Sequence, residues 1–309
     1  MKIVFMGTPD FACPVLEGLI ENYGVSLVVS QPDKKVGRRQ ILTNTPIKEV
    51  ALKHNIEVFQ PVNIKEEYQK IIDLNPDLIV TCAYGQIIPK VLLDCPRLGC
   101  INVHASLLPK LRGGAPIHKS IIDGYSKTGI TIMYMDVKMD SGDIISQREI
   151  EILDSYNLEI LHDKLSVMGR ELLLDTLPSI IDGSNERISQ DENLVTYAYN
   201  IQREEEHIDF TKSSRDVFNL IRGLSPIPGS NAILGGNEFK IYNSIIGTNK
   251  FSNKECGEIC MISKEGISVC TGDGEIIITE LKPFGKKRMD AYSYVNGVGK
   301  DNLIGKVFK

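Results

Sequence analysis

Two polar side chains at the end of an otherwise apolar run are the residues of this chain best placed to do chemistry. The run Gly99–His104 predicts a buried strand, yet it carries the amide of Asn102 and the imidazole of His104. Side chains two residues apart on a strand point the same way, so both would face one point in space. A buried polar group without a partner costs about 1–3 kcal/mol. The pair therefore predicts a site where the two groups meet each other, water or a substrate.

An acidic turn after the next predicted strand would bring a carboxylate to the same edge of the sheet. Asp140 opens the sequence Asp-Ser-Gly-Asp, where an aspartate also serves a turn well. Beside His104 it would stabilise an imidazolium and fix the ring. An amide and a charged imidazole can together hold an oxygen that becomes negative in a tetrahedral intermediate. Because no serine or cysteine stands in a nucleophile-elbow motif, we expect direct acyl transfer to a nucleophile brought by a second substrate.

The first half of the chain alternates strands and helices, which predicts an α/β domain with a doubly wound, mostly parallel, Rossmann-like sheet. A parallel sheet of this kind binds ligands at the carboxyl ends of its strands, where Asn102 and His104 would lie. A long amphipathic helix at about Leu158–Asp182 should pack across the domain. The expected strands are Lys2–Met6, Val25–Ser30, Glu57–Phe59, Leu78–Cys82, Gly99–His104 and Thr131–Met135, and the expected helices are Cys13–Asn22, Pro46–Lys53, Lys65–Leu74 and Ala115–Asp123.

The last third of the chain has a different pattern. We expect a catalytic domain over residues 1–184, a polar linker over 185–206 and a small C-terminal domain over 207–309. Five short strands with glycine-rich corners predict a small β-barrel in this last part, of the OB type. The expected strands are Ser230–Leu234, Phe239–Ile246, Gly257–Ile262, Gly266–Cys270 and Glu275–Leu281.

Several classes of protein are disfavoured by the sequence. The turn after the first strand, Gly7-Thr8-Pro9-Asp10-Phe11, lacks the later glycines of a dinucleotide-binding loop, so we expect no NAD. The seven cysteines form no CxxC pair, so we expect reduced thiols and no metal. No apolar run approaches the roughly 20 residues that span a bilayer. We therefore expect a cytoplasmic protein without a membrane partner.

Several motifs in order make the chain similar to a known family. It resembles the formyltransferases that use 10-formyltetrahydrofolate, and within them the branch whose acceptor is initiator methionyl-tRNA. The resemblance extends through the linker and the C-terminal domain. The motifs are Gly7-Thr8-Pro9-Asp10-Phe11, Gln31-Pro32-Asp33, Ala83-Tyr84-Gly85, Asn102-x-His104, Ser106-Leu107-Leu108-Pro109, Arg112-Gly113-Gly114-Ala115-Pro116 and Asp140-Ser141-Gly142-Asp143.

The resemblance implies roles for individual residues. The acceptor would be the α-amine of methionine esterified to initiator tRNA, and the formyl donor would be the folate. Separately, nothing in the sequence demands a partner subunit, so we expect a monomer. The catalytic residues would be Asn102, His104 and Asp140. The folate-binding residues would be Ser106, Leu107, Leu108 and Pro109, with Tyr84, Gly85 and Asp136 near the pterin.

Two basic segments fit an RNA substrate, because neutralising phosphates is the main source of nucleic-acid affinity. The first is the loop expected after the second strand, with Lys34, Lys35, Arg38 and Arg39. Taken without the resemblance, such a loop is more simply an ordinary solvated surface. The second basic segment lies near the end of the C-terminal domain and contains Lys286, Lys287 and Arg288.

Four other functions compete with this interpretation. The nearest is a sugar-amine N-formyltransferase, which would share the three catalytic residues but have less need of the basic loop. A glycinamide ribonucleotide formyltransferase would leave the C-terminal domain unexplained. A folate hydrolase would use water in place of the amine. A nucleic-acid-binding module without catalysis would leave Asn102, His104 and Asp140 without a role.

Overall fold

A computed structural model of the protein describes residues 1–37 and 39–309, which divide into two units. The first unit comprises Met1–Pro116, Lys127–Glu151 and His162–Tyr199. The second comprises Ile117–Ser126, Ile152–Leu161 and Asn200–Lys309. Each unit has its own sheet and is described by itself.

The first unit is built on a seven-stranded sheet in the order β5-β2-β1-β6-β7-β8-β9. The five strands from β5 to β7 run parallel, and β8 and β9 continue the sheet in antiparallel fashion. The expected mixed, mostly parallel sheet is thus confirmed. Its strands are β1 (Ile3–Gly7), β2 (Leu27–Val29), β5 (Val58–Phe59), β6 (Leu78–Cys82), β7 (Cys100–His104), β8 (Lys127–Tyr134) and β9 (Ile144–Glu151).

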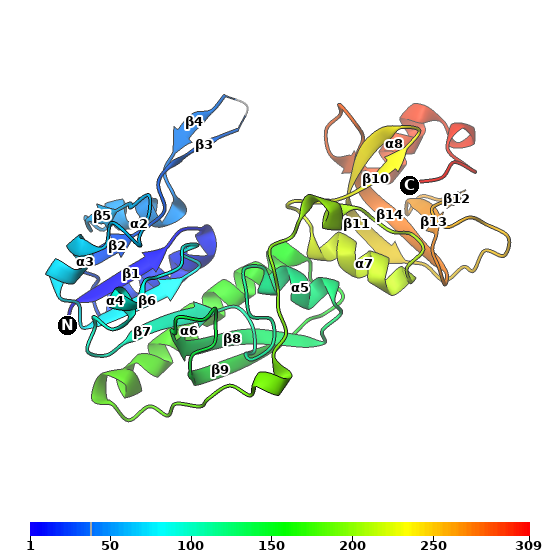
Figure 1. Ribbon diagram of the computed structural model, residues 1–309. Helices are drawn as coiled ribbons and strands as arrows, with labels where there is room; N and C mark the ends of the chain where they lie inside the picture. The colour runs from blue at the N-terminus through cyan, green and yellow to red at the C-terminus, as the bar shows by residue number, and fades with distance from the viewer. Residues whose placement is uncertain (38) are drawn as a thin grey trace. The chain divides into compact units, whose positions relative to one another are not determined.

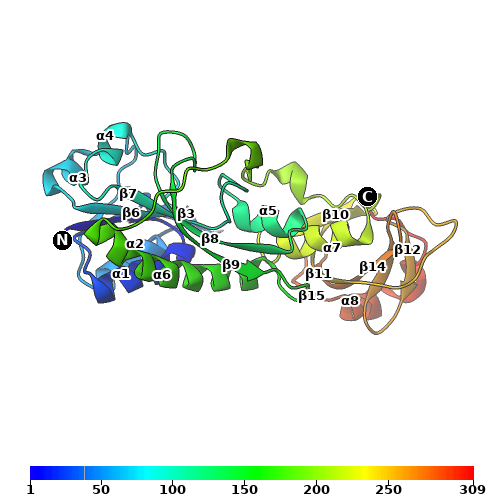
Figure 2. The ribbon, with the colours of Figure 1, turned by 90° about the horizontal axis from the view of Figure 1, so that it is seen from below.

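Helices cover both faces of this sheet, with α3 and α4 on the opposite side from α1 and α6 (Figure 2). The α2 helix begins where Thr45 accepts a hydrogen bond from the backbone N–H of Lys48 and Pro46 occupies the first turn. The helices of this unit are α1 (Cys13–Asn22), α2 (Pro46–Lys53), α3 (Gln69–Leu74), α4 (Lys90–Leu93) and most of α6 (Leu158–Asp182), with short 3-10 turns at Asp10–Ala12 and Glu192–Leu194. After Pro116, α5 (Pro116–Ile122) belongs to the second unit.

The long helix α6 supports the strand that carries His104. A Cβ on Gly169 would lie 3.0 Å from Cγ1 of Val103, so the glycine lets the helix approach β7 closely. The apolar face of α6 is buried, and Ser166 donates a 2.7 Å hydrogen bond to the carbonyl of Phe11. No helix of the described chain is both long and apolar enough to span a bilayer.

The basic segment after β2 was expected to be a loop, and here the sequence interpretation was wrong. It forms a hairpin of β3 (Lys34–Val36) and β4 (Ile41–Thr43), which stands away from the main sheet (Figure 1). Gly37, at φ +70°, supplies the left-handed backbone needed at the turn. Arg38 lies outside the described residues. Each of these strands has only three residues, which is too few to give a strong periodic signal in the sequence. The sequence pattern therefore did not reveal that the two strands pair.

A polar network anchors the base of this hairpin. The Asp33 carboxylate accepts hydrogen bonds from Lys48 Nζ at 2.5 Å and from Gln60 Nε2 at 2.8 Å. The hydrogen bonds from Gln60 and Lys48 hold the pKa of the Asp33 carboxyl below its ordinary value. Gln60 also donates to the carbonyl of Gln31. The network therefore holds two residues, Gln31 and Asp33, directly before β3.

Replacing Asp33 with asparagine should lower the free energy of unfolding by about 1 kcal/mol at pH 7. A carboxyl whose folded-state pKa is depressed stabilises the fold above its unfolded pKa, near 4, and loses that contribution as the pH falls through the folded value. Urea titrations at pH 7, 5 and 3 should therefore show a difference from the wild type that is full at pH 7 and 5 and shrinks at pH 3. Asp94→Asn, in an exposed pair with Lys90, is the control and should change little. A difference that does not depend on pH would contradict the assignment.

The second unit is built on an antiparallel sheet in the order β10-β11-β14-β13-β12, with β15 paired to β14. All five expected strands are confirmed within a few residues. The elements are α7 (Ser214–Gly223), β10 (Ser230–Leu234), β11 (Asn237–Ile246), β12 (Ile259–Ile262), β13 (Ile267–Cys270), β14 (Glu275–Lys282), β15 (Met289–Asp290) and α8 (Ala291–Val298), with 3-10 turns at Arg203–Glu206 and Lys300–Asn302.

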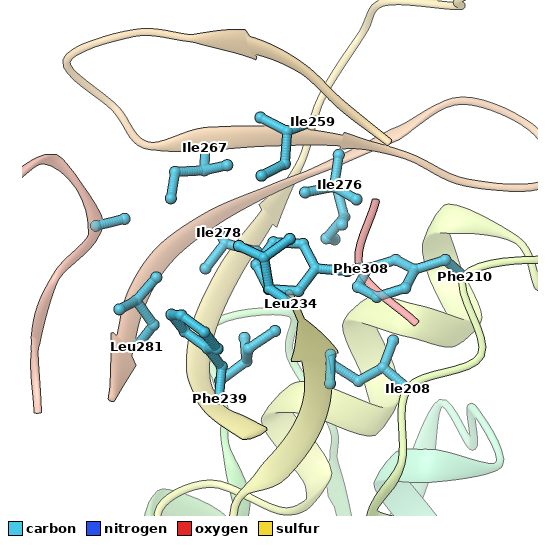
Figure 3. Packing of buried hydrophobic residues seen from close by; sticks show 14 of the residues in the cluster. Ile208, Phe210, Leu234, Phe239, Ile259, Ile267, Ile276, Ile278, Leu281 and Phe308 are labelled. Atoms are coloured by element: carbon cyan, nitrogen blue, oxygen red, sulfur yellow. The ribbon is translucent and has the colours of Figure 1, made fainter. Parts of the chain in front are cut away.

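Aromatic and branched aliphatic side chains fill the interior of the second unit (Figure 3). The Phe308 ring lies 6.0 Å from the ring of Phe210 and 5.8 Å from that of Phe239. All three rings are buried. They therefore stabilise this unit's core and do not form an exposed aromatic surface.

Candidate active site

His104 and Asp140 meet at the carboxyl end of β7. The imidazole Nδ1 lies 3.7 Å from Oδ2 of Asp140, and Nε2 lies 3.1 Å from the carbonyl oxygen of Leu111. A carbonyl only accepts, so this bond assigns a proton to Nε2. The 3.7 Å separation is too long for a direct hydrogen bond. Nδ1 therefore faces the Asp140 carboxylate without a direct hydrogen bond to it, while Nε2 is held by the Leu111 carbonyl.

Asp140 is held in place by the backbone around it. Its Oδ2 accepts a 2.8 Å hydrogen bond from the N–H of Gly113. Its own backbone is left-handed, at φ +50°, which aspartate tolerates better than most residues. The side chain is largely buried beside the nearly fully buried His104. The arrangement fixes a carboxylate against one ring nitrogen of an imidazole.

Asn102 is oriented by a buried hydroxyl that the sequence analysis did not single out. Thr81 on β6 donates a 2.8 Å hydrogen bond from Oγ1 to Oδ1 of Asn102. This bond leaves the amide nitrogen of Asn102, a two-proton donor, turned away from Thr81. Thr81 is 2% exposed, and β6 and β7 pair in register at these two residues. Only the pairing of the two strands makes Thr81 recognisable as a positioning residue.

Replacing Thr81 with valine keeps the side chain's shape and removes the hydroxyl. We expect turnover to fall about 10-fold with little change in the unfolding midpoint, because a small misplacement of a reacting group slows catalysis steeply. Thr128→Val is the matched control, since Thr128 is also buried on the sheet but its hydroxyl has no hydrogen-bond partner in the described structure. Equal turnover of the Thr81→Val enzyme and the wild type would remove the positioning role.

The loop expected to bind folate follows β7 and is tightly supported. Ser106 and Leu108 are buried, whereas Leu107 and Pro109 are half-buried. Thr131 Oγ1 donates to the carbonyl of Ser106 at 2.6 Å and accepts from the N–H of Leu108 at 3.2 Å. Ser106 and Leu108 therefore shape the loop from inside, and a ligand would meet its backbone and the side chains of Leu107 and Pro109.

The other residues expected near the pterin lie after β6 and β8. Tyr84 is buried, its hydroxyl has no hydrogen-bond partner among the described atoms, and burial raises its pKa. Its carbonyl accepts from Thr8 Oγ1 at 2.9 Å and from Gln31 Nε2 at 3.2 Å, which links the segments that follow β1, β2 and β6. Gly85 has φ +86° and is exposed, as is Asp136.

The segment expected to be a linker is hydrogen-bonded directly to the loops around Arg112 and Asp140. The guanidinium of Arg112, 3% exposed, donates to Gln190 Oε1 at 2.8 Å and to Glu192 Oε1 at 2.9 Å. Gln190 in turn donates to the carbonyls of Asp140 and Gly142. Arg112 was noted only as part of a motif, and its burial against Gln190 is the signal that marks it as a positioning residue.

The basic residues of the two units lie in different surroundings. Lys34, Lys35 and Arg39 are exposed on the hairpin. Lys286 and Lys287 are exposed in the second unit, with Lys286 Nζ 5.9 Å above the ring of Tyr294. Arg288 makes two hydrogen bonds to the Glu280 carboxylate and stacks over Tyr242, so its charge is shared within the protein. Of the six described basic residues, Arg288 is thus the one whose charge is paired with a carboxylate.

Comparison with known proteins shows the family to which this chain belongs. Residues 1–177 match the family model described as formyl transferase, and residues 200–299 match the model described as formyl transferase, C-terminal domain. The chain therefore belongs to the formyl transferases. Methionyl-tRNA formyltransferases from Macrococcus caseolyticus and Staphylococcus aureus are each 50% identical to it over 309 residues, covering 99% of this chain and 98% of each relative. Within the formyl transferases, the chain belongs to the methionyl-tRNA formyltransferase family.

Solved structures share the fold at lower identity. The sugar 3N-formyl transferase WlaRD has a TM-score of 0.68 at 21% identity, over 93% of this chain and 99% of its own. An N-formyltransferase from Helicobacter canadensis has a TM-score of 0.68 at 22% identity, over 92% of this chain and 100% of its own. HypX from Aquifex aeolicus has a TM-score of 0.64 at 15% identity, over 96% of this chain and 48% of its own. At these identities the likeness concerns the fold alone.

Proposed function

We propose that this protein transfers the formyl group of 10-formyltetrahydrofolate to the α-amine of methionine on initiator methionyl-tRNA. The observation that carries the proposal is the 3.7 Å approach of His104 Nδ1 to the Asp140 carboxylate at the carboxyl end of β7. Full-length relatives at 50% identity, named methionyl-tRNA formyltransferases, support the choice of acceptor.

The proposed reaction is direct attack of the amine on the formyl carbon. A C–N bond forms to the methionine amine, the bond from the formyl carbon to the folate nitrogen breaks, and the amine's proton ends on that nitrogen. Negative charge gathers on the formyl oxygen as the tetrahedral intermediate forms. Asn102 and His104 would donate hydrogen bonds to that oxygen, which lowers the barrier because both donors are already fixed.

Asp140 is proposed to act through His104 and on the amine. Its carboxylate lies beside Nδ1, and the Leu111 carbonyl contacts the opposite ring nitrogen, so the ring is held in one orientation. The carboxylate oxygens can also accept a proton from the attacking amine. Fixed geometry of this kind replaces the ordering that the reactants would otherwise need in water.

The residues present fit a folate donor at the carboxyl ends of β6, β7 and β8. The Tyr84 hydroxyl is buried without a hydrogen-bond partner in the described structure, and Gly85 bares its backbone beside Gln31. We propose that the donor's ring system contacts Tyr84, Gly85 and Asp136. The loop Ser106–Pro109 would contact the donor nearer its formyl group.

We propose further that residues 1–184 form the catalytic domain, that 185–206 connect it to a second domain over 207–309, and that the latter closes into an OB-like barrel. Hydrogen bonds from the C-terminal segment support closure. Lys309 pairs with Ile233 beside one edge strand, and Phe308 donates to Gly257 beside the other. We expect a cytoplasmic monomer, whose molar mass light scattering would measure.

A formylation assay with two kinds of acceptor tests the function. Purified protein and 10-formyltetrahydrofolate should formylate charged initiator methionyl-tRNA and leave a dTDP-linked amino sugar unchanged. The sugar is the informative competitor because formyltransferases that act on such sugars share the fold. Formylation of the amino sugar without formylation of methionyl-tRNA would overturn the proposal.

A further inference from the structure

Two exposed tyrosine rings lie stacked on the segment after the Arg112 contacts. The rings of Tyr197 and Tyr199 are 5.6 Å apart and nearly parallel, at 4°. Tyr197 is 50% exposed and Tyr199 is 64% exposed, whereas Ala198 between them is fully buried. This alternation is that of a half-buried strand, with both rings on the solvent side. Because the two rings stack on each other, they form one contiguous exposed aromatic surface, the kind of feature that indicates an interaction site.

Hydrogen bonds attach this segment to the catalytic loop. The Thr196 carbonyl accepts from the N–H of Arg112 at 2.9 Å, and the N–H of Ala198 donates to the Arg112 carbonyl at 2.8 Å. Thr196 Oγ1 accepts from the N–H of Leu111 at 2.9 Å. A Cβ on Gly113 would lie 2.6 Å from the Ala198 carbonyl oxygen, so the glycine allows this approach.

The same loop residues contact the proposed catalytic groups. Leu111 provides the carbonyl for His104 Nε2, and Gly113 provides the N–H for Asp140. The stacked rings are therefore anchored through single residues to the groups that would hold the reacting carbon. A ligand bound to the rings would therefore lie on a segment that is hydrogen-bonded to the residues that contact His104 and Asp140.

We propose that Tyr197 and Tyr199 form a stacking platform for the adenine base of the 3′-terminal nucleoside of the acceptor tRNA. This inference rests on the proposed function. The methionyl ester is carried on the ribose of that nucleoside, so the base must lie near the amine that attacks. Single-stranded bases bind by stacking on aromatic side chains, and each such contact strengthens binding about 10-fold or more. Stacking needs no recognition of the base edge, which suits two rings exposed on an open surface.

The aromatic rings of the folate donor are the competing occupant. Small ligands of that size bind in concave sites that bury most of their surface. Tyr197 and Tyr199 lie on an exposed segment, and the residues assigned to the donor follow β6, β7 and β8 instead. The exposure of the rings therefore favours an RNA base over the folate.

Fluorescence of a modified tRNA tests the platform. Initiator tRNA carrying 2-aminopurine as its 3′-terminal base should lose fluorescence on binding the wild type, because stacking quenches this base. The double variant Tyr197→Ala/Tyr199→Ala should bind the tRNA without quenching and about 10-fold more weakly. The double phenylalanine variant should quench as the wild type does. Tyr292→Ala, which removes another exposed tyrosine from α8, is the matched control and should leave quenching unchanged.

A second measurement separates stacking from a general loss of affinity. Removing the 3′-terminal nucleoside from unmodified tRNA should weaken binding to the wild type about 10-fold and to the double alanine variant hardly at all. Full quenching by the alanine variant, or equal sensitivity to the truncation, would overturn the platform. A loss of affinity for 5-formyltetrahydrofolate in the alanine variant would assign the rings to the donor and also overturn it. Failure of the wild type to formylate methionyl-tRNA would instead overturn the proposed function.

Discussion

Replacing His104 with alanine should lower the turnover of formyl transfer to methionyl-tRNA by at least about 100-fold. The substitution removes the ring that faces Asp140 at 3.7 Å and breaks the contact with the Leu111 carbonyl. Without it, the formyl oxygen would lose one of its two proposed hydrogen-bond donors, and the Asp140 carboxylate would lose its neighbouring ring. Single-turnover formylation with saturating donor measures the chemical step directly.

Two controls keep this result interpretable. His54→Ala removes an exposed histidine from the end of α2 and should leave turnover unchanged. Because His104 is 5% exposed, its loss also creates a small cavity, so the unfolding midpoint and the affinity for 5-formyltetrahydrofolate should be measured in parallel. Turnover within about fivefold of the wild type in a folded variant would exclude His104 from the chemistry.

Replacing Lys34, Lys35 and Arg39 together with alanine should raise the KM for methionyl-tRNA about 10-fold or more near physiological salt and change the KM for the folate little. Each cation that neutralises a phosphate releases counterions, and contributes about 0.7–0.9 to the slope of log affinity against log salt. Loss of three contacts should therefore reduce the magnitude of that slope by about 2.1–2.7. Binding titrations between 50 and 200 mM salt provide the measurement.

A variant with the same change in charge elsewhere separates a specific contact from net charge. Lys53, Lys65 and Lys212 are exposed, and replacing all three with alanine also removes three positive charges. This control should leave the salt slope nearly unchanged. If the hairpin variant and the control have equal slopes, the hairpin is ordinary surface and the RNA is bound elsewhere.

The sequence predicted the elements that have a local pattern. Apolar runs and capping residues placed α1, α2 and α6 at the bounds observed, and the alternation of strands and helices predicted the mostly parallel sheet. The motif around Asn102 and His104 predicted the family, which comparison with relatives confirmed. The roles of these two residues and of Asp140 stay predictions, for which the geometry provides support.

The hairpin and the partners of the basic residues depended on the tertiary structure. The sequence around Arg288 does not indicate its ion pair with Glu280. The two residues meet only when β14 pairs with β15, which directly follows Arg288. Likewise, the exposed strands β3 and β4 bury too little to leave a periodic pattern. In both cases the residue types alone are compatible with an ordinary surface, and the deciding contact, a backbone ladder in the hairpin and an ion pair at Arg288, exists only in the folded chain.

The sequence by itself determined that an amide and an imidazole stand at the end of β7. These residue types were enough to predict acyl transfer as the class of reaction. Only the tertiary structure decided that Gln190 and Thr196, about 80 residues beyond Arg112 and Leu111, hold the catalytic loop. Hydrogen bonds between such distant segments leave no periodic trace, because each uses a single polar residue in a stretch without regular structure. Local propensity forms strands and helices, whereas the position of the loops between them is set by contacts that exist only after the chain has folded.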